Sequence, residues 1–188
     1  MAHSSVSAEE RNRIEQAHAA YCRGLDRFDR EVALSAFTSD AVLNYSGIYV
    51  GDAPGFMDWV WPFHEQLELN VHRVANVFIQ RNPSGDLVSE AYVTSLLRRS
   101  EGDVFIDRVG YGRYIDRWAE TGDGRLAIIE REYVNDLVTE MRNPAHASRA
   151  VAAVDGVPTF QAARSRDDAS YRLFTGTGLL QPTSSGAG

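Results

Sequence analysis

The feature that most constrains the fold is a run of four strand-like segments in the second half of the chain. These segments cover residues 71–80, 87–98, 104–118 and 126–138. The junction between each pair of segments is short and contains glycine, as is typical of hairpin turns. Because strands joined by short turns pair with their sequence neighbours, this half of the chain predicts an antiparallel meander.

A capping box marks the start of the first helix. Ser7 and Glu10 have the spacing at which each side chain caps a backbone N–H of the other residue. Apolar residues then recur at helical spacing, which places Tyr21 on the buried side of the helix. We expect this helix to close at the segment that ends with Asp26.

Two more helices are expected before the meander. Asp29 is placed to cap a short helix over residues 30–37, and residues 52–69 form an aromatic-rich helical region. Pro62 interrupts this region and is expected to bend or break the helix. Between the two helices, a turn at residues 38–40 is expected to lead into short strands, which are residues 41–45 and 48–50. Three helices followed by a sheet predict an α+β fold with the helices on one face of the sheet.

The composition changes near the C-terminus. The chain has 188 residues, 44% of them hydrophobic, which suits a single core. Residues 141–188 are rich in Ala, Arg, Ser and Gly and show weak periodicity. We therefore predict one domain over residues 1–140 and a partly ordered extension over residues 141–188, with a short helix near residues 147–154.

The charge and hydropathy of the chain argue against several partners. A net charge of -7 and a pI near 5.2 do not favour binding to nucleic acid or to anionic membranes. No apolar run approaches the roughly 18 residues that span a bilayer. The first ten residues show no pattern of a secretory signal, so we expect a cytoplasmic protein.

The residue types also limit the available chemistry. All 19 basic residues are arginine, and a chain without lysine cannot form a Schiff base or attach pyridoxal phosphate. Cys22 is the single cysteine, so no internal disulfide and no cysteine-based zinc site can form. His3, His64 and His146 show no ligand-like spacing with one another. We expect neither a metal nor a cofactor.

His72 and Asp26 are the main catalytic candidates. An imidazole is the natural general base near neutral pH. Asp26 lies near a helix C-terminus, where a carboxylate is mildly unfavourable, and this favours a role in orienting His72. Strand alternation places four side chains on one face as a semi-polar pocket wall, namely His72, Val74, Asn76 and Phe78. The alternatives are a histidine satisfied in the core and an aspartate paired with a nearby arginine.

Tyrosine and aromatic side chains are candidates for the rest of the pocket. Tyr21 and Tyr45 are possible acids, since a phenol can donate to a carbonyl that gains charge when a neighbouring C–H bond breaks. Ordinary core tyrosines are the alternative. Trp59, Trp61 and Phe63 are expected to shape the pocket. Three arginines on the long strands either line the pocket or form surface pairs, namely Arg108, Arg113 and Arg131.

Four motifs together resemble the SnoaL-like branch of the nuclear transport factor 2-like superfamily over residues 7–140. They are Tyr21-x4-Asp26, Phe37-x2-Asp40-Ala41, His72-x3-Asn76 and Gly112-Arg113-Tyr114-x-Asp116. Within this superfamily the chain is most similar to cofactor-free lyases, namely scytalone dehydratase, bile acid dehydratase and hexachlorocyclohexane dehydrochlorinase. The resemblance implies a cone-shaped barrel, in which a strongly curved antiparallel sheet and three N-terminal helices enclose a pocket, within a homo-oligomer (trimer or dimer).

The resemblance also implies roles for individual residues. Asp26 and His72 fall on the catalytic Asp–His dyad, and Tyr21 and Tyr45 match active-site tyrosines of the bile acid enzyme. Asn135 stands where that enzyme has a catalytic-site arginine. We therefore expect Asn135 to bind the substrate, and Arg131 nearby to take the place of the missing arginine. The pocket residues named above are expected to bind the substrate as well.

These observations favour a cofactor-independent dehydratase. The Asp–His dyad would abstract a proton and eliminate water from a hydroxylated, largely apolar polycyclic molecule, of the steroid or polyketide kind. An isomerase, a cyclase or a dehydrohalogenase with the same dyad also fits, because each begins by removing a proton from carbon. Two non-enzymatic functions stay open as well: a structural subunit, like the β subunit of ring-hydroxylating dioxygenases, and a ligand-binding module without turnover.

Overall fold

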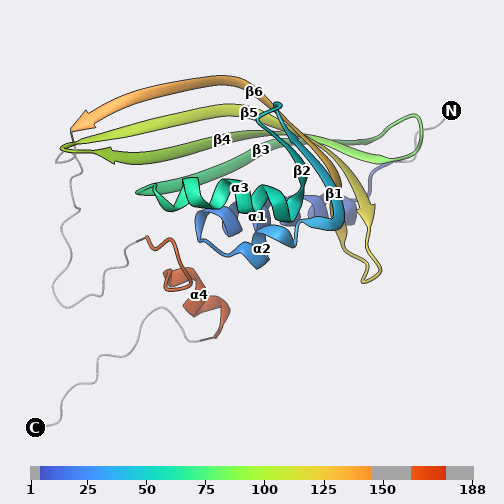
Figure 1. Cartoon of the computed structure of the whole chain (residues 1–188). Coiled ribbons are helices and arrows are strands. Elements are labelled where there is room, and N and C mark those ends of the chain that lie inside the picture. Colours follow the sequence, from blue (N-terminus) through green and yellow to red (C-terminus); the bar gives the residue numbers. More distant parts are fainter. Residues whose placement is uncertain (1–4, 145–161, 177–188) are drawn as a thin grey trace, which may run out of the picture.

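The computed structural model describes residues 5–144 and 162–176. A strongly curved sheet carries three N-terminal helices on its concave side, as Figure 1 shows. The predicted α+β class and curved, mostly antiparallel sheet are confirmed. The expected barrel is an open cone, because the strand order β2-β1-β6-β5-β4-β3 leaves β2 and β3 as free edges.

Three of the described helices precede the four long strands along the chain, and the fourth described helix follows them. The helices are α1 (Ala8–Asp26), α2 (Arg30–Leu34), α3 (Ala53–Glu65) and α4 (Ala169–Phe174). The strands are β1 (Phe37–Tyr45), β2 (Tyr49–Asp52), β3 (Leu69–Arg81), β4 (Leu87–Glu101), β5 (Val104–Glu120) and β6 (Leu126–Pro144).

The predicted capping box and meander are confirmed. The Ser7 backbone N–H donates to Glu10 Oε2 over 2.7 Å, and the Glu10 N–H donates to Ser7 Oγ over 3.1 Å. Strands β3 to β6 pair antiparallel in chain order. β6 runs to Pro144, past the predicted domain boundary at residue 140. The helix predicted near residues 147–154 lies outside the described residues.

The segment after α2 differs from the prediction. α2 ends at Leu34, and residues 38–40 belong to β1 where a turn was expected. The reason is pairing with the last strand: Phe37 lies opposite Ile128, whose N–H donates to the carbonyl of Ala36. β1 and β6 pair parallel, so a contact between distant parts of the chain overrides the local turn signal.

α3 continues through Pro62 to Glu65, so the expected break is wrong. Asp52 caps its N-terminus by accepting from the Gly55 N–H over 2.7 Å. The helix buries one face, including Met57 and Val60, against the core. This packing stabilises the helix although proline removes one backbone donor.

A bulge at Asn76 changes which side chains of β3 face the core. Asn76 has a φ of 51°, and the pairing register with β4 shifts between Ala75 and Phe78. The alternation therefore reverses, so that Ile79 is buried whereas Phe78 is 62% exposed. The prediction that Asn76 and Phe78 share a face with His72 in a pocket wall is wrong for this reason.

A buried ion pair joins β5 and β6 beneath the aromatic core. Arg131 and Asp116 lie opposite each other, and the guanidinium Nε and Nη2 donate to the two carboxylate oxygens over 2.7 and 2.8 Å. Both side chains are fully buried. His18 from α1 lies beside them, with Nδ1 3.4 Å from Arg131 Nη2. Burial lowers the pKa of His18 to about 4, so its imidazole stays neutral.

The bulge can be tested by changing Asn76. We expect Asn76→Val to lower the free energy of unfolding by about 1–2 kcal/mol, because a β-branched residue resists positive φ. Asn76→Gly should be neutral or stabilising. Arg73→Val, at an exposed position with ordinary strand backbone, is the control and should change little. Urea denaturation of the three variants measures this, and equal effects of the two valine substitutions would contradict the bulge.

The buried pair of Arg131 and Asp116 leads to a second prediction. Asp116→Asn leaves the Arg131 guanidinium buried without a counter-charge, and we expect a loss of about 3–5 kcal/mol in the free energy of unfolding. Glu130→Gln is the matched control, because it breaks the Arg117–Glu130 pair between the same two strands where both side chains are exposed. This exposed pair should contribute at most about 1 kcal/mol. Chemical denaturation of both variants would compare the two losses directly.

Candidate functional site

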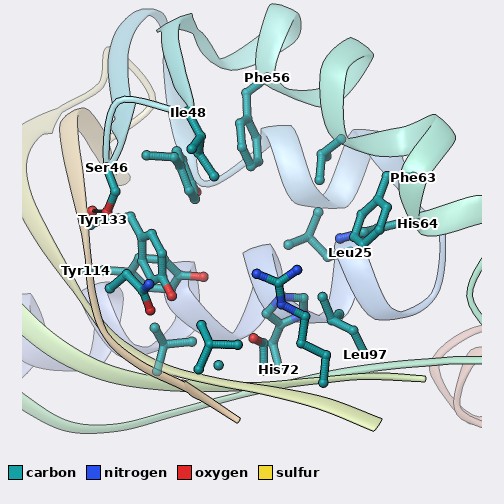
Figure 2. Close-up of a pocket in the computed structure, with 18 of the residues that line it drawn as sticks. Leu25, Ser46, Ile48, Phe56, Phe63, His64, His72, Leu97, Tyr114 and Tyr133 are labelled. Atoms are coloured by element: carbon teal, nitrogen blue, oxygen red, sulfur yellow. Dashed lines mark hydrogen bonds between the residues drawn. The ribbon is translucent and has the colours of Figure 1, made fainter. Parts of the chain in front are cut away.

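A cavity of about 560 Å³ lies between α3, the end of α1 and the inner face of the sheet (Figure 2). Its walls are mainly aliphatic and aromatic. The apolar lining includes Leu25, Ile48, Phe56, Val60, Val93 and Leu97. A cavity of this size and character suits a small molecule with an apolar body.

The structure brings Asp26 and His72 together at this cavity. Asp26 is the last residue of α1, and its Oδ1 lies 2.8 Å from Nδ1 of His72. The two carboxylate oxygens also accept the His72 backbone N–H over 3.1 and 3.0 Å. Because a carboxylate only accepts here, Nδ1 carries the proton and Nε2 is left as the basic nitrogen. His72 lines the cavity, so this arrangement can serve as a general base.

The two predicted tyrosines also meet in the cavity wall. The hydroxyl oxygens of Tyr21 and Tyr45 lie 2.6 Å apart, and both rings are buried. Burial raises the pKa of both phenols, that of Tyr21 well above its ordinary value. The phenols therefore stay protonated. One hydroxyl donates to the other, which leaves one phenolic proton for a ligand.

Arg131 supports the tyrosines from behind and does not line the cavity. Its guanidinium carbon lies 3.9 Å from the ring centroid of Tyr114 and 4.7 Å from that of Tyr21. A cation over the faces of aromatic rings is favourable, and here Asp116 compensates its charge. The expected contact between Arg131 and a substrate is replaced by a structural contact with the tyrosine wall.

The other predicted pocket residues divide into two groups. Those that line the cavity are Trp59, Phe63 and Asn135. Those that lie elsewhere are Trp61, Val74, Asn76 and Phe78. Trp61 points to another part of the core and packs edge-to-face against Phe28, with 5.3 Å between ring centroids. Val74 and Asn76 line a second cavity of about 440 Å³ between α1 and β3.

His64 was given no role by the sequence, whereas Arg108 was expected either to line the pocket or to form a surface pair, and both residues line the cavity. His64 on α3 is buried, and its Nδ1 lies 3.0 Å from Nδ2 of Asn70. Arg108 on β5 is exposed at the cavity, and among the described residues no carboxylate forms an ion pair with it. Helical spacing from Val60 puts His64 on the buried face of its helix, which is the one local signal that it points inward.

The described part of the C-terminal extension packs beside the dyad without lining the cavity. Arg164 donates to the backbone carbonyl of His64 over 2.5 Å and to that of Leu67. Arg166 and Tyr171 both bind the Asp29 carboxylate, with the Tyr171 hydroxyl at 2.7 Å. This segment therefore fixes the end of α3 relative to the start of α2.

Two features of the described residues concern metals and membranes. No group of three or more His, Cys, Asp or Glu side chains in this part of the chain is placed to hold a metal ion. None of the helices described is long and apolar enough to cross a membrane. The residues that gather at the cavity are a base with its acid and several neutral hydrogen-bond donors, which suits proton transfer from carbon.

Comparison with solved structures shows which proteins share this fold. A candidate scytalone dehydratase from Novosphingobium aromaticivorans superposes with a TM-score of 0.62 and 18% identity, over 80% of this chain and 96% of that one. The hexachlorocyclohexane dehydrochlorinase LinA-type3 from Novosphingobium barchaimii gives 0.60 and 17%, over 77% and 96%. ActVI-ORFA from Streptomyces coelicolor gives 0.58 and 16%, over 69% and 98%.

Comparison of the sequence with protein families identifies the family of this chain. No curated protein matches the chain. The sequence profile of the SnoaL-like domain, however, matches residues 6–132, which contain both members of the Asp–His pair and both cavity tyrosines. The chain therefore belongs to the SnoaL-like domain family.

Proposed function

We propose that the protein is a cofactor-independent lyase that removes a proton from carbon and eliminates water. The observation that carries this proposal is the 2.8 Å contact between Asp26 and His72 at the wall of an apolar cavity. The same cavity holds the Tyr21–Tyr45 pair. A base, its orienting acid and neutral donors in one apolar cavity are the parts that such an elimination requires.

The proposed reaction starts at Nε2 of His72. This nitrogen takes the proton from a carbon next to a carbonyl, and the electrons of the C–H bond move towards the carbonyl oxygen. The negative charge of Asp26 stabilises the imidazolium that forms. When the carbon–oxygen bond of the neighbouring hydroxyl breaks, a carbon–carbon double bond forms. His72 returns its proton to the departing hydroxide, which leaves as water.

The phenols stabilise the charge that develops on the carbonyl oxygen. Tyr21 and Tyr45 remain protonated, since burial raises their pKa values. The free proton of the pair donates to the oxygen as it becomes an enolate, when the hydrogen bond is strongest. The buried Arg131 behind the rings keeps them in position.

The cavity favours a hydroxylated polycyclic substrate. Its aromatic wall includes Phe56, Trp59 and Phe63, and these flat rings suit a molecule of fused rings. Asn135 and Arg108 provide polar contacts for its oxygen atoms. Steroid-like and polyketide-like compounds have this combination of an apolar ring system and a few oxygens.

Dehydrohalogenation is the second candidate. One structural relative is named a hexachlorocyclohexane dehydrochlorinase, and removal of hydrogen chloride begins with the same loss of a proton from carbon. The two reactions differ only in the leaving group, chloride or hydroxide. Product analysis with hydroxylated and with chlorinated ring compounds separates them.

Proton abstraction can be tested before the substrate is known. The full-length protein is incubated in D₂O with a set of hydroxylated multi-ring ketones. Proton NMR follows deuterium entry next to the carbonyl, and mass spectrometry follows loss of water. We expect His72→Ala and Asp26→Asn to lower the rate by about 10²–10⁴-fold, since they remove the base or its orienting acid.

Phe78→Ala is the control for this experiment, because Phe78 lies on β3 but outside the cavity. This variant should keep the wild-type rate. Circular dichroism and the denaturation midpoint establish that each variant is folded. A folded His72→Ala protein with an undiminished rate would exclude the mechanism.

A further inference from the structure

We propose that His64 is a second hydrogen-bond donor of the active site, a neutral imidazole whose Nε2–H binds an oxygen atom of the substrate beside the base. This inference rests on the proposed function and adds a residue to it. Its evidence is the position of the ring in the cavity and the hydrogen bonds that fix its proton. These two points are independent of the Asp26–His72 contact.

The tautomer of His64 is set by Asn70. The Asn70 side chain is buried, and one of its side-chain atoms, Nδ2, lies 3.3 Å from the Leu25 carbonyl oxygen and 3.0 Å from His64 Nδ1. A carbonyl oxygen only accepts, so the atom that contacts it must be the amide nitrogen. This nitrogen donates to His64 as well. Nδ1 is therefore an acceptor, and the ring proton lies on Nε2.

His64 lies on the same side of the cavity as the base. The ring centroids of His64 and His72 are 6.1 Å apart, and both side chains line the cavity. Figure 2 shows the two histidines towards one side and Tyr114 and Tyr133 towards the other. A substrate that reaches His72 therefore passes close to the imidazole of His64.

The surroundings of His64 keep it neutral. Burial lowers its pKa to about 3, and repulsion from the Arg164 guanidinium, and from His72 once that ring is protonated, acts in the same direction. When His72 takes a proton from the substrate, His64 does not compete for it. A histidine that cannot accept the proton but can donate a hydrogen bond acts as an oxygen-binding group.

The proposed elimination requires a hydrogen-bond donor in addition to the one that the tyrosine pair provides. The Tyr21–Tyr45 pair has one proton left after its mutual hydrogen bond, which suits the carbonyl oxygen. Elimination involves a second oxygen, that of the leaving hydroxyl, which lies close to the carbon attacked by the base. The position of His64 near His72 suits this second oxygen.

The tautomer can be measured directly on the wild-type protein without a ligand. Nitrogen-15 NMR of the histidine side chains should show His64 with a bare Nδ1 and a protonated Nε2. Its signals should stay unchanged from about pH 5 to 8, the range in which an ordinary histidine titrates. A proton on Nδ1, or titration of His64 in this range, would overturn the proposal.

Two substitutions separate a donor from a structural residue. Glutamine keeps an N–H donor and leucine does not. We expect His64→Leu to lower kcat by about 10²–10³-fold with little change in KM, and His64→Gln to recover most of this loss. Equal activity of the leucine and glutamine variants would overturn the proposal, and the NMR measurement decides it if either variant fails to fold.

The same experiments distinguish this inference from the proposed function. If His64→Leu retains full activity while His72→Ala has none, the donor role of His64 is wrong and the lyase mechanism stands. If His72→Ala retains the wild-type rate of deuterium entry, the proposed function itself falls, whatever the tautomer of His64.

The lowered pKa of His64 also predicts how stability depends on pH. An unfolded histidine gains a proton below about pH 6.5, whereas folded His64 does not until about pH 3. The unfolded state therefore binds more protons in this range, and the free energy of unfolding falls as the pH falls from about 6.5 towards 3. His64→Gln should show a weaker decrease than the wild type in urea denaturation. An identical decrease would contradict the buried neutral imidazole.

Discussion

The contact between Asp26 and His72 joins the first helix to the sheet and creates the candidate site at the same time. Asp26 accepts both the backbone N–H and the ring N–H of His72, so it fixes the strand and the imidazole together. A carboxylate at a helix C-terminus opposes the helix dipole by roughly 0.3–1 kcal/mol. Hydrogen bonds to a charged acceptor are strong enough to offset this.

Residues close to Asp26 and His72 in the chain form a further hydrogen bond between the first helix and the sheet. Asn70 bonds the carbonyl of Leu25, one residue before the aspartate, and also orients His64 on α3. The end of α1, the start of β3 and the end of α3 therefore meet at one buried set of hydrogen bonds. The base and the second imidazole depend on the same few backbone positions, which explains why they lie close together.

Behind the tyrosine wall charge is kept away from the cavity surface, whereas Arg108 on β5 brings a charge to the cavity itself. The fully buried pair of Arg131 and Asp116 lies behind the tyrosine wall, where each charge compensates the other. The groups that face the cavity from this wall and from α3 are neutral donors, namely Tyr21, Tyr45 and His64. His72 is the group proposed to change charge during the reaction. In an apolar cavity, such an arrangement limits the desolvation that proton transfer would require.

Local patterns in the sequence determined much of this fold. The capping box at Ser7 and Glu10 and the glycine-containing turns fix helix and strand positions through contacts within a few residues, and these predictions hold. The motifs also placed four residues in one site. His72, Tyr21 and Tyr45 line one cavity, and Asp26 bonds His72 at its wall. Helical spacing predicts that Tyr21 faces inward, whereas the pairing of Asp26 with His72 and the place of Tyr45 were implied by the resemblance to the SnoaL-like family.

Only the tertiary structure decided the remaining features, because each depends on residues far apart in the chain. Pairing with Ile128 starts β1 early, and the positive φ of Asn76 turns Phe78 away from the cavity. The open edge of the sheet and the parallel pairing of β1 with β6 have no local signal. His64 became a candidate only when folding brought Asn70, whose amide also binds the Leu25 carbonyl, to its ring, since a proton's position is set by spatial neighbours.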